Sequence, residues 1–276
     1  MSTEEITAEY EVAEVAPSIE LRVKPIVTVA AKTDMGRVRD NNEDKHEYFL
    51  AEGDAEIASK GHIFIVCDGM GGHEAGQVAS ELACKTFIDV YRNHPSNDLQ
   101  LAANGAVLAA NRFVNDVSRT VPGRKGMGTT LTALIIRQDK GIIAQVGDSR
   151  LYRLRDGILE MLTTDHTWIE EAVSTGMMSR EEAEQHPYRH VITRALGTEA
   201  MVTPDLFELD IQVGDTFFLC SDGVTNHVKD DQLHTFMSMA SPSAICWNVV
   251  SAALVDGGSD NATAMVVRVD DLENVE

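Results

Sequence analysis

Apolar and polar positions alternate in recognisable patterns along most of the chain. Short apolar runs typical of strands lie at residues 26–31, 47–51, 62–67, 203–209, 215–220 and 262–269. Helical spacing of apolar residues predicts helices at about 75–92, 99–117, 230–239 and 242–254. Four further apolar runs, separated by tight turns, lie between residues 131 and 162 and predict an antiparallel meander.

The order of these elements is informative about the fold class. Strands come first, then two helices, more strands, further helices and a last strand. Because strands and helices do not alternate regularly, the order favours a layered α+β domain over a doubly wound parallel sheet. Residues 165–200 are polar and interrupted by Gly176 and Pro187, with short helices expected at 167–174 and 179–185. Such a long irregular segment predicts a flap over a site.

Charge limits the classes of partner. The chain has 276 residues, with 23 Lys and Arg against 44 Asp and Glu, so its net charge is −21. This balance argues against nucleic acid and against an anionic membrane surface as partners. Residues 1–20 contain six glutamates and no basic residue. We therefore predict a flexible acidic tail at 1–24, which is either a solvated extension or docks onto basic groups, followed by one domain at 25–271.

The cysteines and the N-terminal residues indicate a compartment. The four cysteines are widely scattered without a C-x-x-C spacing, which argues against a zinc ribbon or a redox motif. The first residues lack the basic start and apolar stretch of a secretory signal, and no apolar run approaches the length of a membrane span. These features predict a soluble protein of the reducing cytoplasm.

Carboxylates recur at the ends of the predicted strands. Asp68-Gly69 and Asp222-Gly223 follow apolar runs directly, as does Asp148, and further acidic groups precede strands at Glu43-Asp44 and Asp260. A single Asp-Gly is most simply a turn. Several unpaired carboxylates at the rim of a buried sheet, however, are costly unless cations compensate them. All-oxygen ligands select hard ions, so the joint pattern predicts a Mg²⁺ or Mn²⁺ site.

Eight short motifs then appear in a fixed order along the chain. They are R-x-x-N-E-D at 39–44, D-G-M-G-G-H-E-A-G at 68–76, G-M-G-T-T at 126–130, G-D-S-R at 147–150, T-x-D-H-T at 163–167, R-A-L-G at 194–197, C-S-D-G at 220–223 and S-D-N-A-T at 259–263. In this order the chain closely resembles the bacterial branch of the metal-dependent (type 2C, PPM family) serine/threonine protein phosphatases. The resemblance spans about residues 26–270 and implies a four-layer α-β-β-α sandwich with two antiparallel sheets.

The resemblance also implies a set of metal ligands and two or three Mn²⁺ or Mg²⁺ ions. It makes Asp68 a bridge between two ions and the carbonyl of Gly69 a ligand of one of them. The other implied ligands are Asp222 and Asp260, the pair Glu43 and Asp44, and, for a third and looser ion, Asp148. Paired ions of this kind lower the pKa of a shared water toward ~7, which provides the attacking group for hydrolysis.

Other residues are implied in substrate handling. Arg39 matches the phosphate-binding arginine of the family, since a planar guanidinium grips two phosphate oxygens at once. Many eukaryotic members carry a histidine directly after the Asp-Gly, but Met70 stands there in this chain. The general acid is therefore open between His73, His166 and a metal-bound water, with a structural hydrogen bond as the simpler role of each histidine. His190 in the flap is a further candidate contact to the third ion.

Two classes of function follow from the resemblance. The first is an enzyme, a protein-serine/threonine phosphatase that reverses the action of serine/threonine kinases on phosphorylated proteins. The alternative is a catalytically silent module that keeps the fold and binds phosphoproteins. The complete set of acidic residues favours the enzyme, because a silent relative would be free to lose them. Nothing in the sequence indicates oligomers, so we expect a monomer.

Overall fold

Two antiparallel sheets form the centre of the molecule. The computed structural model describes residues 19–71, 74–184 and 186–275. The first sheet has the order β1 (Val23–Asp34), β11 (Ala262–Asn274), β10 (Thr216–Cys220), β7 (Arg150–Arg155) and β8 (Ile158–Met161). The second has the order β2 (Asp44–Phe49), β3 (His62–Met70), β5 (Leu131–Arg137), β6 (Lys140–Val146) and β9 (Asp205–Asp210), with β4 (Gly128–Thr129) beside β3.

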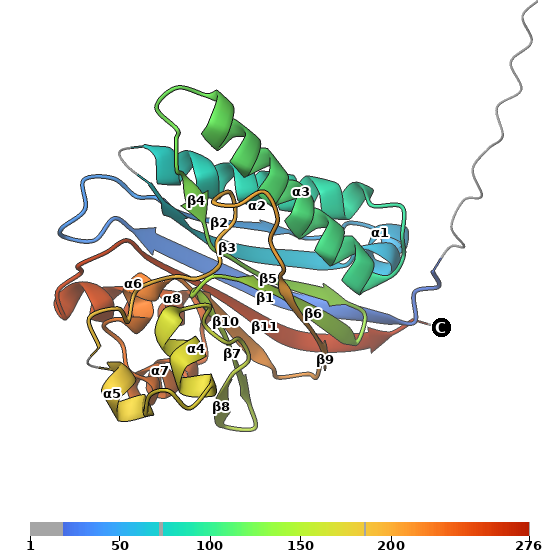
Figure 1. Cartoon of the computed structure of the whole chain (residues 1–276). Helices are drawn as coiled ribbons and strands as arrows, with labels where there is room; N and C mark the ends of the chain where they lie inside the picture. The colour runs from blue at the N-terminus through green and yellow to red at the C-terminus, as the bar shows by residue number, and fades with distance from the viewer. Residues whose placement is uncertain (1–18, 72–73, 185, 276) are drawn as a thin grey trace, which may run out of the picture.

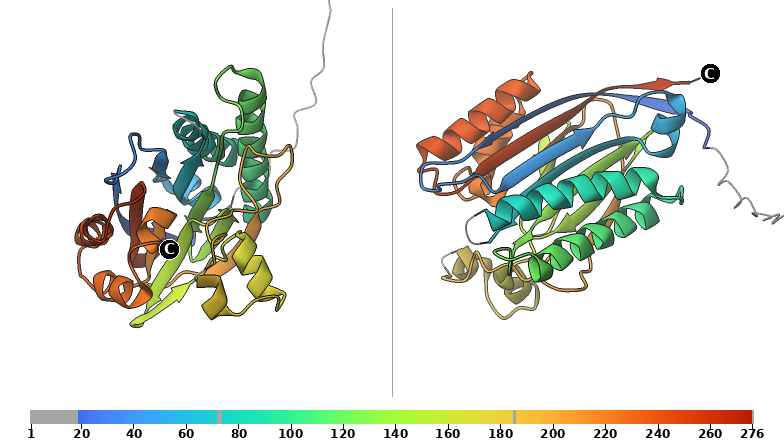
Figure 2. Two further views of the ribbon diagram at one scale, coloured as in Figure 1. Left: turned by 60° about the vertical axis from the view of Figure 1, so that its left-hand side comes forward. Right: turned by 90° about the horizontal axis from the view of Figure 1, so that it is seen from above.

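Helices cover the outer face of each sheet, as Figures 1 and 2 show. On the second sheet lie α2 (Ala75–Asn93) and α3 (Leu99–Thr120), while the short α1 (Asp54–Ser59) follows β2. On the first sheet lie α6 (Asp222–Thr225), α7 (Asp230–Met237) and α8 (Pro242–Val255). The flap contains α4 (Trp168–Ser174) and α5 (Arg180–Glu184). The predicted α-β-β-α sandwich is confirmed.

The alternation of side chains along β3 explains the layering. Ile63, Ile65 and Cys67 pack beneath α2 and α3, whereas Phe64 and Val66 point into the space between the two sheets. Successive residues of a strand face opposite sides, so a strand with helices on one face and a sheet on the other is apolar throughout. Each such buried side chain contributes about 1.5–3 kcal/mol. A rigid β3 thereby ends in Asp68 at a fixed place.

The predicted meander is wrong in its middle. The first two runs pair as β5 and β6 and the last two as β7 and β8, but β6 continues to β9 and β7 to β10. The chain therefore changes sheet between Val146 and Arg150. Gly147 in this connection has φ of 106°, a conformation that favours glycine. Hydrophobic alternation does not reveal which sheet a strand joins, so the change of sheet was not visible in the pattern.

Other boundaries differ by a few residues. β2 begins at Asp44 instead of residue 47, because its first residues pair with the end of β3. β1 begins at Val23 and pairs with the end of β11 at Asn274, so the sheet extends slightly beyond the predicted domain limits at both ends. Most of the predicted tail, residues 1–18, lies outside the described residues. Within the described ranges, none of the helices has the length and apolar character needed to cross a membrane.

Candidate active site

Asp68 lies where the end of β3 meets three neighbouring segments. It stands directly opposite Asp44 in the pairing of β2 with β3. Its main-chain N–H donates to Thr130 Oγ1 at 2.8 Å, and its carbonyl accepts from the N–H of Thr130 at 2.8 Å and from Thr129 Oγ1 at 2.9 Å. The threonines of G-M-G-T-T therefore hold the Asp68 backbone, so their role in this structure is structural.

The glycine after each aspartate is required by close packing. A Cβ on Gly69 would lie 2.1 Å from the carbonyl oxygen of Gly76, and one on Gly223 would lie 1.9 Å from that of Asn261. Neither glycine has a positive φ, so sharp turning is not the reason for these two residues. The close contact at Gly223 brings α6, which begins with Asp222, against the segment that contains Asp260.

Asp44 is tied to the same region by Ser221. Ser221 Oγ donates to Asp44 Oδ2 at 2.7 Å and accepts from the Thr263 N–H at 3.0 Å. Since Ser221 precedes Asp222 and Thr263 lies at the start of β11, this hydroxyl joins β2 to both segments that carry the other aspartates. Sequence analysis assigned no role to Ser221, although it is part of the C-S-D-G motif.

Asp148 is placed by the connection between β6 and β7. The Gly147 N–H donates to His166 Nδ1 at 3.1 Å, and the His166 N–H donates to the Gly147 carbonyl at 2.9 Å. Ser149 Oγ and Thr130 Oγ1 share a hydrogen bond of 2.8 Å. These contacts connect the Asp148 turn to the strand that supports Asp68.

Five aspartates consequently face one another with their charges largely uncompensated. Burial raises the pKa of Asp68 well above its usual range, and the charges of Asp44, Asp222, Asp148 and Asp260 raise it further. Burial and the neighbouring Asp222 and Asp260 raise the pKa of Asp44 to about 7, although hydrogen bonds from two hydroxyls oppose the rise. For Asp148, burial and then Asp222 raise the pKa to about 8. Carboxyl groups shift in this way when each lacks a nearby cation.

Several oxygens of the cluster accept no hydrogen bond. They are Oε1 of Glu43 and Oδ1 of both Asp44 and Asp148, all of which are buried. Leaving a buried carboxylate oxygen without a donor is costly, so such atoms indicate a ligand that supplies positive charge. Oxygen donors alone suit hard divalent cations. The residues therefore fit the Mn²⁺ or Mg²⁺ ions that the resemblance implies.

Protein donors occupy other oxygens of the cluster. Arg39 Nη2 donates to Asp260 Oδ2 at 2.6 Å, and Asn226 Nδ2 donates to Asp222 Oδ2 at 3.1 Å. Across residues 19–71, 74–184 and 186–275, no three His, Cys, Asp or Glu side chains are arranged as a ready-made cage for one ion. The side chains are gathered, and protein groups still donate to Asp260 and Asp222.

A cavity of about 670 Å³ adjoins this cluster on the flap side. Asp148 and Asp222 line one part of it, and His190 and Arg189 of the flap line another. A larger cavity, about 810 Å³, lies beside the C-terminal end of α3, and the lining residues that the structure describes there include no carboxylate. We therefore associate the cavity next to the flap with the chemistry, because it contacts the buried aspartates.

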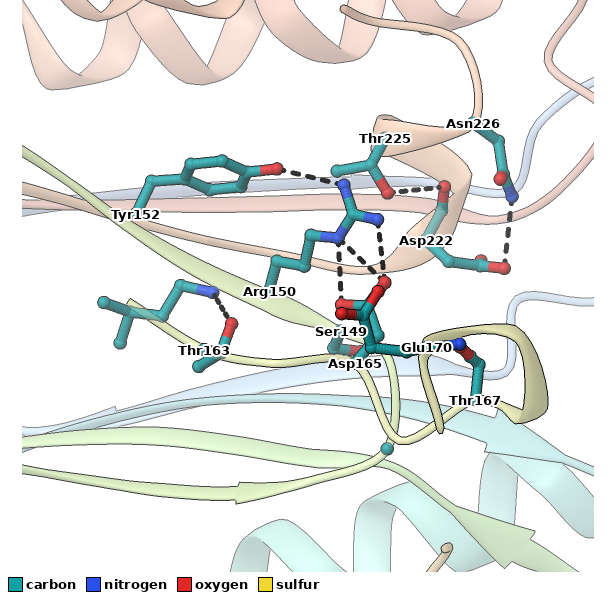
Figure 3. Close-up of polar contacts among 12 residues, drawn as sticks. Ser149, Arg150, Tyr152, Thr163, Asp165, Thr167, Glu170, Asp222, Thr225 and Asn226 are labelled. Carbon is teal, nitrogen blue, oxygen red and sulfur yellow. Dashed lines mark hydrogen bonds and ion pairs between the residues drawn. The ribbon is translucent and has the colours of Figure 1, made fainter. Parts of the chain in front are cut away.

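Arg150 connects the flap to the site (Figure 3). Its Nε and Nη2 donate to Asp165, with Nη2 to Oδ2 at 2.7 Å, and its Nη1 donates to the Tyr152 hydroxyl at 3.2 Å. Figure 3 shows this guanidinium between Tyr152 and Asp165, and Arg150, Asp165, Asp222 and Asn226 line the same cavity. Sequence analysis quoted Arg150 and Asp165 within motifs but gave them no role. Their pairing was not predictable because they lie on separate segments.

The three candidate histidines have different positions. His166 is only 3 % exposed, its Nδ1 accepts the Gly147 N–H, and its Nε2 lies 3.2 Å from Asp205 Oδ2. This histidine therefore supports the Asp148 turn and is not placed to donate a proton to substrate. His190 is exposed and lines the cavity beside the flap. His73 lies outside the described residues.

Comparisons with known proteins agree with this geometry. The protein phosphatase 2C family model matches residues 37–256, which is more than half of the chain. The chain belongs to the protein phosphatase 2C family. It is also 36 % identical over 244 residues to the serine/threonine phosphatase stp of Listeria monocytogenes serotype 4b (strain F2365), covering 87 % of this chain and 94 % of that protein. The chain is accordingly a serine/threonine protein phosphatase that acts on phosphoproteins, and the predicted enzyme class is confirmed.

Solved structures of bacterial phosphatases share the fold. The catalytic domain of the phosphatase PstP, crystallised with two manganese ions, is 34 % identical with a TM-score of 0.76, over 89 % of this chain and 99 % of that one. The phosphatase Stp1 of Staphylococcus aureus is 28 % identical with a TM-score of 0.82, over 91 % of this chain and 98 % of that one. The phosphatase thus belongs to a metal-dependent family, and the reading as a silent module is set aside.

Proposed function

We propose that this phosphatase hydrolyses phosphoserine and phosphothreonine in proteins with two tightly held divalent ions, Mn²⁺ or Mg²⁺, at the end of β3. The residues that would hold them are Asp68, the Gly69 carbonyl, Asp222, Asp260, Glu43 and Asp44. A third, weaker ion would lie between Asp148 and Asp222 at the edge of the cavity beside the flap.

One observation carries this proposal. Five aspartates from five separated parts of the chain share one buried region, and burial together with their mutual repulsion raises the pKa of four of them. Arg39 is the one Arg or Lys that donates to any of these aspartates through its side chain in the described residues, at Asp260. Because burying so many like charges is unfavourable, divalent cations are the compensating partners that the donor set suits.

The chemistry divides between the ions and the protein. When bound, the ions supply an activated water and neutralise negative charge on the phosphate. Arg39, whose guanidinium is half exposed at the site, would turn from Asp260 to grip the phosphate oxygens. The flap closes one side of the cavity, and its residues would contact the protein segment around the phosphorylated residue. No side-chain nucleophile is required, which agrees with the motifs.

The proposal also covers the substrates, the oligomeric state and the cellular compartment. We infer that the substrates are proteins modified by a serine/threonine kinase and that the enzyme acts as a monomer in the cytoplasm. Its four cysteines are free and buried, as expected for a reducing compartment. The acidic surface charge disfavours nucleic acid as a partner.

Hydrolysis of p-nitrophenyl phosphate and of a phosphothreonine peptide tests the proposal. We expect turnover with Mn²⁺ and no turnover with EDTA, restored by adding Mn²⁺ in excess. Wild-type turnover in EDTA would contradict it. For the third ion, Asp148→Asn should lower turnover about tenfold while calorimetry still detects the tightly bound ions. Loss of all Mn²⁺ binding in this variant would remove the distinction between the sites.

A further inference from the structure

The side chain of His227 joins two segments that carry proposed metal ligands. Its Nδ1 lies 3.0 Å from Asp256 Oδ2, and its Nε2 lies 2.9 Å from Ser259 Oγ. The main-chain N–H of Ser259 also donates to Nε2, at 3.2 Å. The His227 side chain is 11 % exposed, whereas its partner Asp256 is 66 % exposed at the surface. His227 lies outside the eight sequence motifs, so the sequence alone offered no signal for it.

These hydrogen bonds determine the tautomer of the ring. A main-chain N–H can only donate, so Nε2 of His227 must be an acceptor and Nδ1 carries the proton. That proton is donated to the Asp256 carboxylate. The order Asp256, His227, Ser259 has the connectivity of a hydrolytic triad. Here, however, Nε2 of His227 also accepts the main-chain N–H of Ser259. The ring therefore holds the backbone of the loop at Ser259 as well as the hydroxyl group.

Each end of this connection leads directly to a proposed ligand. Asn226, which precedes His227, donates its Nδ2 to Asp222 Oδ2 at 3.1 Å, as Figure 3 shows. Ser259 precedes Asp260. The ring therefore forms a second link, beside the close contact at Gly223, between the segment that carries Asp222 and the segment that carries Asp260.

The same loop also supports the segment of the phosphate-binding arginine. The Gly258 carbonyl accepts from the Arg37 N–H at 2.8 Å. A Cβ on Gly36 would lie 2.3 Å from the Asp260 carbonyl oxygen, so the two loops are in close contact. Arg39 follows in this segment and bonds to Asp260. A displacement of residues 256–260 would consequently move both a ligand and the arginine.

We propose that His227 is a positioning residue of the metal centre, which orients Asp222 and Asp260 toward each other by binding Asp256 and Ser259. The inference rests on the proposed function, since it concerns the ligands assigned there. Groups that orient metal ligands typically change metal affinity or activity by about 10–100-fold when they are removed. His227 acts through main-chain and side-chain contacts and does not touch the substrate in this assignment.

Calorimetric titration of the full chain with Mn²⁺ tests the inference. We expect His227→Ala to weaken Mn²⁺ binding by about 10–100-fold. His227→Gln should regain part of the affinity, because its Oε1 can accept from the Ser259 N–H. His234→Ala is the matched control: this neighbouring histidine contacts the Gly157 carbonyl at 2.8 Å, away from the cluster, and its removal should leave Mn²⁺ affinity unchanged.

Two further measurements separate positioning from a general loss of folding. In EDTA, the melting temperature of His227→Gln should match that of the wild type within a few degrees, and its kcat should approach the wild-type value when Mn²⁺ is in large excess. Wild-type Mn²⁺ affinity in both His227 variants would overturn the inference, as would losses that excess Mn²⁺ does not restore. Absence of Mn²⁺ binding by the wild-type protein would contradict the proposed function itself.

Discussion

Two groups of buried carboxylates in this protein differ in their partners. In the first, each carboxylate has a cationic side chain: Asp215 accepts Nε and Nη2 of Arg155, both at 2.6 Å, and Arg150 binds Asp165. In the second, Asp68 and its neighbours face mainly one another. Both groups consist of the same residue type.

Asp205, a partly buried carboxylate that also has a cationic partner, illustrates the effect of such a partner on a pKa. Although burial raises the pKa of Asp205, hydrogen bonds from His166 and Arg194 bring it below the usual value. At Asp68, burial and the neighbouring carboxylates act in the same direction and raise the pKa. A carboxylate that supports the fold is thus accompanied by its counter-charge, whereas among the described residues Arg39 is the one Arg or Lys whose side chain donates to the five aspartates of the catalytic cluster. Most of the compensating positive charge is therefore expected from outside the chain.

The largest effect is expected from Asp68→Asn. It removes a central charge of the cluster, so we expect turnover to fall about a thousandfold or more, which corresponds to ~4 kcal/mol in the activation free energy. Stability in EDTA should stay the same or rise, because one repelling charge is lost. Steady-state kinetics with Mn²⁺ and urea unfolding in EDTA measure the two quantities. Turnover within a few-fold of the wild type would contradict the assignment.

Arg155→Met, by contrast, should lower the stability of the fold. It leaves Asp215, whose side chain is fully buried, without its cation, and we expect a loss of about 3 kcal/mol in the free energy of unfolding. The control is Arg153→Met, whose partner Glu160 is half exposed, with an expected loss below about 1 kcal/mol. Urea unfolding checks both. Equal losses for the two variants would show that burial of the pair is not the deciding factor.

Arg39→Ala tests the one cation of the catalytic cluster. Charge-assisted hydrogen bonds contribute about 1.5–3 kcal/mol, so KM for a phosphopeptide should rise about 10–100-fold with a smaller change in kcat. Arg39→Lys should recover only part of the effect, because lysine lacks the planar fork. An unchanged KM in Arg39→Ala would mean that Arg39 binds Asp260 only and not the phosphate.

The last prediction concerns the pH dependence of stability. Asp44 and Asp148 have raised pKa values in the folded protein, about 7 and about 8, so their protonated forms favour folding. In EDTA, stability should therefore increase as the pH falls from 8.5 to 6, by about 1.4 kcal/mol per pH unit for each proton taken up. With saturating Mn²⁺ this increase should disappear. Stability in EDTA that falls over the same pH range would contradict uncompensated repulsion in the cluster.

Much of the fold was predictable from local patterns. The helices at 75–92 and 99–117 correspond to α2 and α3, because amphipathic spacing is a local property that packing preserves. The change of sheet between β6 and β7 was not predictable, because the residues around Gly147 are compatible both with a hairpin and with a connection to another sheet. Likewise, α1 was missed because its two buried residues, Ile57 and Ala58, are adjacent and show no helical spacing.

The sequence by itself determined which residues make up the site. They are acidic residues at strand ends, two of them followed by glycine, within motifs of one phosphatase family. Only the tertiary structure decided which groups meet, because contacts such as Ser221 with Asp44 or His227 with Ser259 join residues that are 177 and 32 positions apart. Periodicity and composition report neighbours along the chain. Charge repulsion and orientation at the site depend instead on distances through space, which the packing of two sheets sets.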